Sequence, residues 1–153
     1  MANKTVSGLG EMKALEGEHL GYSSWIEIAQ DRVDAFADAT GDHQWIHVDP
    51  ERAAKESPFG GPIAHGYLTL SLVPALYHEV IDVQNLKMVV NYGLNKVRFP
   101  APVPVGKRVR LGMEVASVED VQGGIQCIFK TTMEIDGGEK PAMVAEVVFR
   151  YYA

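Results

Sequence analysis

The sequence predicts one α+β domain in which helices gather on one face of an antiparallel sheet. Three features indicate this: a segment at 66–81 that is apolar on nearly every side, a second half without a long helical period, and a length of 153 residues with 46% hydrophobic content. A helix that is apolar all round belongs inside a core. The length supports one compact domain and would be cramped for two.

The first forty residues contain a weak element and two clearer ones. Residues 1–20 are expected to form an N-terminal segment, a short helix or an ordered tail, and residues 21–153 the domain itself. Residues 22–28 alternate apolar and polar side chains as a first strand does. Residues 30–40 have helical spacing, and Gly41 can end that helix in the left-handed conformation.

The middle of the chain carries further helix signals. Asp49 is a good N-cap and Pro50 suits the first helical position, so a short helix is expected to begin there. The Pro- and Gly-rich stretch 57–62 cannot continue it. The segment 66–81 is then predicted to be the central helix, with a kink or local irregularity at Pro74 because proline removes a backbone donor.

Strands are predicted for the remainder of the chain. Turn signals divide it at 100–106, at Gly123 and at 136–138. The last strand has one apolar face and one mixed face, as expected for a sheet covered on one side. The predicted strands are residues 86–92, 95–99, 108–118, 124–135 and 144–152.

Composition narrows the possible partners and compartments. A net charge of -6 argues against a general nucleic-acid binder. Cys127 is the one cysteine, which excludes an intrachain disulfide, and its place in a strand suggests sheet packing. The sequence shows no charged-then-apolar leader and no long apolar span. We therefore expect a soluble cytoplasmic protein that binds neither nucleic acid nor membrane.

An acid and an imidazole lie five positions apart (47 minus 42), at Asp42 and His47. Five helical steps turn by roughly 140°, and an odd separation on a strand places side chains on opposite faces. The pair can converge only if a loop separates them. Gly41 before the pair and Asp49-Pro50 after it favour such a loop, so we predict that both residues lie between two helices.

Each candidate residue also has a structural interpretation. Asp42 could be a helix-end cap, His47 a loop histidine with satisfied hydrogen bonds, and Gly66 a packing glycine. His65 is expected to bond backbone near the turn rather than to act in catalysis. His43 and His47 could share a helical face as metal ligands, but the expected loop argues against that, so no metal is predicted.

Residues 39–42, 47–50, 61–66 and 91–99 together resemble the MaoC-like dehydratase family, which includes the R-specific enoyl-CoA hydratases. The resemblance runs from about residue 20 to the C-terminus. It implies the hot dog fold, an antiparallel sheet wrapped around one long helix, normally paired as a dimer with the sheets side by side. Many members have Asn-Pro between the acid and the histidine, where this chain has Gln44-Trp45.

The resemblance also implies a division of labour at the site. Asp42 and His47 together would hold and deprotonate one water molecule, and one of them would return a proton to the α carbon of the substrate. The backbone NH of Gly66 would contact the thioester oxygen, which fits a glycine at a helix start. No cofactor is expected, because coenzyme A is part of the substrate.

Four basic residues stand close together in this acidic chain: Lys96, Arg98, Lys107 and Arg108. They could attract the phosphates of coenzyme A, or they could be solvated surface charges. If they bind coenzyme A, Lys96 and Arg98 are the residues expected to do so. Both interpretations stay open at this point.

The function predicted is a hydro-lyase: a homodimeric R-specific enoyl-CoA hydratase that also runs as a 3-hydroxyacyl thioester dehydratase. Three alternatives remain: a dehydratase acting on acyl carrier protein, an acyl-CoA thioesterase, and a non-catalytic acyl-binding partner subunit. The fold alone does not decide among them.

Overall fold

The structure is a computed structural model that describes residues 2–153. Its helices are α1 (Gly8–Lys13), α2 (Gln30–Thr40), α3 (Trp45–Val48), α4 (Pro50–Glu56), α5 (Gly66–Ser71) and α6 (Val73–Val80). Its strands are β1 (Lys4–Ser7), β2 (His19–Tyr22), β3 (Ile26–Glu27), β4 (Ile81–Gln84), β5 (Met88–Arg98), β6 (Arg108–Val121), β7 (Gly124–Ile135) and β8 (Met143–Tyr152).

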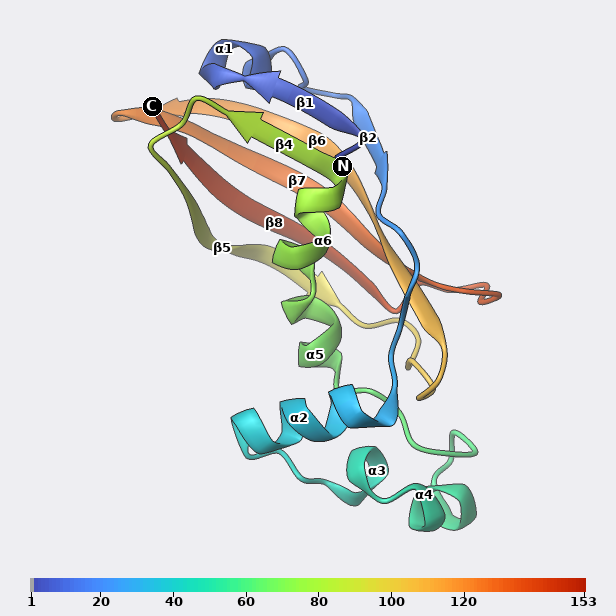
Figure 1. Cartoon of the computed structure of the whole chain (residues 1–153). Helices are drawn as coiled ribbons and strands as arrows, with labels where there is room; N and C mark the ends of the chain where they lie inside the picture. Colours follow the sequence, from blue (N-terminus) through green and yellow to red (C-terminus); the bar gives the residue numbers. More distant parts are fainter. Residues whose placement is uncertain (1) are drawn as a thin grey trace.

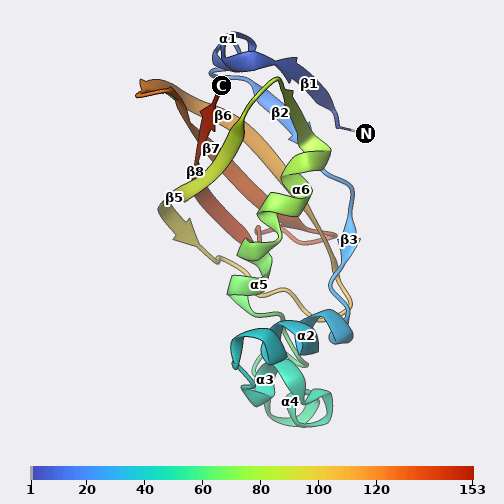
Figure 2. The same ribbon diagram turned by 60° about the vertical axis from the view of Figure 1, so that its left-hand side comes forward.

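One antiparallel sheet forms the body of the molecule. Its strands follow the order β2-β6-β7-β8-β5, and β3 pairs with β6 beside β2. β7 and most of β8 bury every second side chain, so one face of the sheet is apolar there. The sheet curves around α5 and α6, whereas α2, α3 and α4 gather at the end where α5 begins (Figures 1 and 2). The predicted α+β class and hot dog fold are confirmed.

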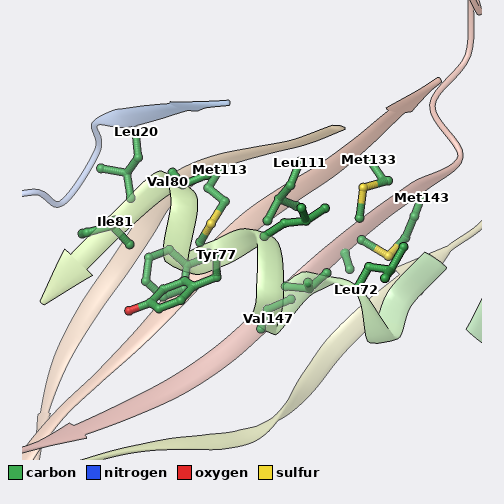
Figure 3. Packing of buried hydrophobic residues seen from close by; sticks show 14 of the residues in the cluster. Leu20, Leu72, Tyr77, Val80, Ile81, Leu111, Met113, Met133, Met143 and Val147 are labelled. Atoms are coloured by element: carbon green, nitrogen blue, oxygen red, sulfur yellow. The ribbon is translucent and has the colours of Figure 1, made fainter. Parts of the chain in front are cut away.

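The central helix is buried as predicted, in two segments. Leu68, Val73, Leu76 and Val80 are each at most 5% exposed. Figure 3 shows α6 packed against side chains of the sheet. The two segments meet at Leu72, just before Pro74 at the start of α6, which is the irregularity expected where proline removes a donor.

The N-terminal residues pack onto the core. β1 and β4 pair in parallel and form a second, two-stranded sheet, which the sequence pattern does not predict. Met12 and Leu15 are buried and belong to the main hydrophobic cluster. The predicted boundary at residue 20 stays a prediction. No helix within residues 2–153 has both the length and the apolar character needed to cross a membrane.

The prediction of one continuous strand at residues 22–28 is wrong, because the chain forms two short strands, β2 and β3, in this region. Ser23 interrupts it between β2 and β3, because its hydroxyl accepts the hydrogen bond that the Leu111 amide would otherwise give to a ladder carbonyl, at 2.9 Å. Conversely, residues 88–98 form one strand where two were predicted. The pairing of β5 with β8 shifts register twice, near Gly93 and Leu94, where the sequence suggested a gap between two strands.

A pair of buried phenols lies between α6 and β8. The hydroxyls of Tyr77 and Tyr151 are 2.6 Å apart, and both residues are at most 4% exposed. Burial raises the pKa of Tyr77 to about 12 and the pKa of Tyr151 well above its usual value. Both therefore stay protonated, and each hydroxyl depends on the other.

Replacing either tyrosine with phenylalanine leaves one buried hydroxyl unpaired. We expect Tyr77→Phe and Tyr151→Phe each to lower the free energy of unfolding by about 1–3 kcal/mol. The double variant should lose less than the sum of the two, because no orphaned hydroxyl remains. Urea unfolding of the four proteins measures this. Strictly additive losses would contradict the pairing.

Candidate functional site

Asp42 is delivered to the site by the end of α2. Gly41 ends that helix with φ 87°, the left-handed conformation that the sequence predicted. The Asp42 carboxylate then accepts a hydrogen bond from the Gln44 amide at 3.3 Å, which turns the chain back toward the domain. The carboxylate stays about half exposed, with 54% of the side chain accessible.

His47 lies in α3, a single helical turn. The prediction that residues 42–47 form a loop is therefore wrong for the second half of that segment and right for the first. The physical reason is that residues 41–44 already supply the turn needed for convergence. Asp49 and Pro50 start α4 as predicted, with the Asp49 carboxylate accepting from the Arg52 amide at 3.1 Å.

The His47 ring is fixed by a backbone contact. Its Nδ1 lies 2.7 Å from the carbonyl oxygen of Ile63, and because a carbonyl only accepts, Nδ1 carries the proton. The neutral ring then has an unprotonated Nε2, which can accept a proton or a hydrogen bond. The His47 carbonyl in turn accepts from the Gln30 side chain at 2.7 Å.

His65 completes the cluster from the residue before α5. Its Nε2 donates to the backbone carbonyl of Asp42 at 3.0 Å, so it bonds backbone as predicted. Its ring stacks on the His47 ring with centroids 3.9 Å apart. A carboxylate oxygen of Asp42, a ring nitrogen of His47 and a ring nitrogen of His65 all lie within 4.8 Å of one another. The structure therefore brings the predicted acid and imidazole together.

A cleft of about 420 Å³ opens beside His47 and reaches Gly66, the first residue of α5. The ring of Phe99 covers one side of Gly66, where an added Cβ would come within 3.1 Å of it. Thr69, one turn further along α5, also lines the cleft and is buried. The cleft is otherwise mostly apolar, since its wall includes Phe59, Ile63, Ala64, Phe99, Pro100, Ala101, Pro102, Val103 and Ala142.

The cluster has metal-ligand residue types but not metal-ligand geometry. The His47 and His65 rings are nearly parallel, 24° apart, so their in-plane lone pairs run side by side and do not converge on one point. The His65 Nε2 that faces Asp42 also carries a proton. Ligands at about 2.0 Å around one ion would need both rings to turn.

The basic residues are placed outside the cleft wall. Lys96 lines a separate surface hollow with Lys130 and Glu146. Arg98 donates to the neighbouring Val97 carbonyl. Arg108 forms an ion pair with Asp136, which lies just after the end of β7. A role for Lys96 and Arg98 in binding coenzyme A therefore stays a prediction.

Two contacts of the site could not be predicted from the sequence. The His47–His65 stack joins residues 18 positions apart (65 minus 47), and Gln30 reaches the His47 carbonyl from the start of α2. Only the adjacency of His65 to Gly66 marked this histidine. No spacing rule indicates that its ring would lie against the predicted catalytic imidazole.

Fold and site together define a hot dog protein with a carboxylate and an imidazole at the start of its central helix. Residues 11–136 match the family model described as the MaoC like domain. The chain belongs to the MaoC-like dehydratase family, as the resemblance implied.

Named relatives agree with this assignment. The chain is 54% identical over 151 residues to 3-hydroxyacyl-thioester dehydratase Z of Mycobacterium tuberculosis, covering 98% of this chain and 99% of the relative. An (R)-hydratase from A. caviae involved in PHA biosynthesis is 28% identical, with a TM-score of 0.71 over 88% of this chain and 94% of the other. A monoamine oxidase regulatory protein from Archaeoglobus shares the fold, at 23% identity and a TM-score of 0.80 over 100% and 99%.

Proposed function

We propose that this protein is an R-specific enoyl-CoA hydratase that also dehydrates 3-hydroxyacyl thioesters. One observation carries the proposal: a carboxylate oxygen of Asp42 lies within 4.8 Å of a ring nitrogen of His47, and His47 lines the cleft that reaches Gly66. One water molecule can bridge that separation with two hydrogen bonds of about 2.8 Å. The names of the relatives, an (R)-hydratase and a 3-hydroxyacyl-thioester dehydratase, support the same chemistry.

The pair supplies the proton transfers of hydration. The oxygen of the bridging water forms a bond to the β carbon, and the water gives up a proton to Asp42 or His47. The His47 Nε2 is available for this, because Nδ1 is occupied by the Ile63 carbonyl. A proton then passes from the pair to the α carbon, so that H and OH add across the double bond. Dehydration follows the same steps in reverse.

Gly66 supplies the group that stabilises the intermediate charge. Electron density moves to the thioester oxygen as water attacks the β carbon. As the first residue of α5, Gly66 has a backbone NH without an intrahelical acceptor. Its lack of a side chain lets other groups approach its backbone closely, as the Phe99 ring already does on one side. Such a donor contributes about 10²- to 10³-fold in rate.

Removing either member of the pair should abolish most activity while the fold remains. We expect Asp42→Asn and His47→Ala each to lower kcat for hydration of crotonyl-CoA by at least roughly 10²-fold. Loss of the enoyl absorbance measures the rate. Matched controls are Asp38→Asn and His43→Ala, which remove an exposed acid and an exposed histidine that pair with each other at 2.9 Å near the site.

The controls should hydrate at nearly the wild-type rate. Near-normal hydration by both the Asp42 and His47 variants would remove these residues from the mechanism. The same assay separates the alternatives. Release of free thiol would indicate a thioesterase, and binding without turnover would indicate a non-catalytic acyl-binding subunit. Turnover only of substrates attached to acyl carrier protein would indicate an acyl-carrier-protein dehydratase.

Lys96 and Arg98 are proposed to attract the phosphates of coenzyme A. Reversing both charges (Lys96→Glu with Arg98→Glu) should raise the KM for crotonyl-CoA several-fold and leave kcat unchanged, because the change acts on binding and not on chemistry. The effect should shrink as salt is added, since exposed charges are screened. A matched reversal at Lys13 and Lys55 serves as the control. An unchanged KM would assign Lys96 and Arg98 to the solvated surface.

We further propose a cytoplasmic homodimer joined along β5. This strand forms an edge of the sheet and exposes Met88, Val89, Tyr92 and Leu94, each at least 42% accessible. An open edge with large apolar side chains is typical of a strand that pairs with another chain. A second copy is the partner that the family resemblance implies.

Introducing a charge on this edge should separate the subunits. We expect Leu94→Glu to convert a dimer of 16.8 kDa chains into monomers, measured by light scattering after gel filtration. Tyr22→Glu, which removes a similarly exposed apolar side chain on β2, is the control and should stay dimeric. A wild-type protein that is monomeric at micromolar concentration would contradict the proposal.

A further inference from the structure

We propose that His65 is a positioning residue for the hydration reaction, through its hydrogen bond to the backbone carbonyl of Asp42. The inference rests on the proposed function for its readout in rate. His65 would contact neither substrate nor water. It would hold the Asp42 carboxylate at the distance from His47 at which one water fits.

Asp42 needs such a restraint because its local contacts are weak. It follows Gly41 in an exposed turn, and its bonds within that turn are long: 3.5 Å from its amide to the Thr40 hydroxyl and 3.3 Å from the Gln44 amide to its carboxylate. Within the part of the chain that the structure describes, the 3.0 Å bond from His65 is the hydrogen bond that ties Asp42 to a distant segment. Loss of that bond would free the turn to move.

Packing alone does not explain a histidine at position 65. The residue is 3% exposed, and its Nδ1 has no hydrogen-bond partner among residues 2–153. A buried nitrogen without a partner costs stability, which a phenylalanine of similar shape would avoid. The apolar contact with Phe36, at 4.9 Å between centroids, would suit either ring. The feature that histidine supplies here and phenylalanine lacks is the Nε2 proton given to the Asp42 carbonyl.

The same short segment also fixes the other groups of the site. The Ile63 carbonyl orients His47, and Gly66 provides the amide proposed for the thioester oxygen. Residues 63–66 therefore connect all three groups to the start of α5. A displacement of about 1 Å in such an arrangement can cost roughly 10²-fold in rate.

Two substitutions separate the hydrogen bond from the ring. Glutamine carries an amide NH₂ at about the place of the imidazole Nε2, so His65→Gln keeps the donor and loses the ring. His65→Phe keeps a ring and loses the donor. We expect His65→Phe to lower kcat for crotonyl-CoA about 10²-fold with KM nearly unchanged, and His65→Gln to stay within about tenfold of wild type.

Stability and spectra complete the test. Urea unfolding identifies any variant that fails to fold, and NMR of ¹⁵N-labelled protein follows the Asp42 amide and the His47 ring. Those signals should shift in His65→Phe and stay close to wild type in His65→Gln. A folded His65→Phe with wild-type kcat, or equal losses in both variants, would overturn the inference.

The outcome for His65 can be told apart from the outcome for the proposed function. A wild-type protein that neither hydrates crotonyl-CoA nor dehydrates the 3-hydroxy product refutes the proposed function, and the NMR signals then still test the positioning. Unchanged Asp42 and His47 signals in His65→Phe would refute the positioning by itself.

Discussion

Burial of α5 and α6 against the curved sheet is the constraint on which the site depends. The apolar side chains of this helix and of the sheet fill one core, which fixes where the helix begins. The residues just before that start, 63–65, are therefore attached directly to a rigid element. A site attached to such an anchor can keep its distances constant to within a few tenths of an ångström.

The two proposed catalytic side chains have different surroundings: His47 is buried, whereas Asp42 is exposed. His47 is 9% exposed and bonded to Ile63, so its ring has one orientation and one free nitrogen. Asp42 projects from an exposed turn, with 54% of its side chain accessible to solvent. Between them, the buried imidazole of His65 links the turn to the core. In the proposed reaction, water would reach Asp42 from solvent, and the apolar cleft beside His47 would hold the acyl thioester.

The sequence predicted the elements that depend on local rules. Gly41 ended its helix, Asp49 and Pro50 began the next, and the all-apolar pattern of 66–81 gave a buried helix. Where prediction failed, a distant contact had decided the local structure. Ser23 breaks a strand because Leu111 lies opposite it. Residues 45–48 are a different case: they turn helical because residues 41–44 already supply the turn that brings Asp42 and His47 together. Local periodicity contains no information on such pairings.

The most direct measurement of the central claim is a crystal structure of the Asp42→Asn protein with crotonyl-CoA bound. The account predicts the thioester oxygen about 2.9 Å from the Gly66 nitrogen. It also predicts a water between position 42 and the His47 Nε2, on the side of the β carbon. An enoyl group bound away from this cleft, with its thioester oxygen remote from Gly66, would contradict the account.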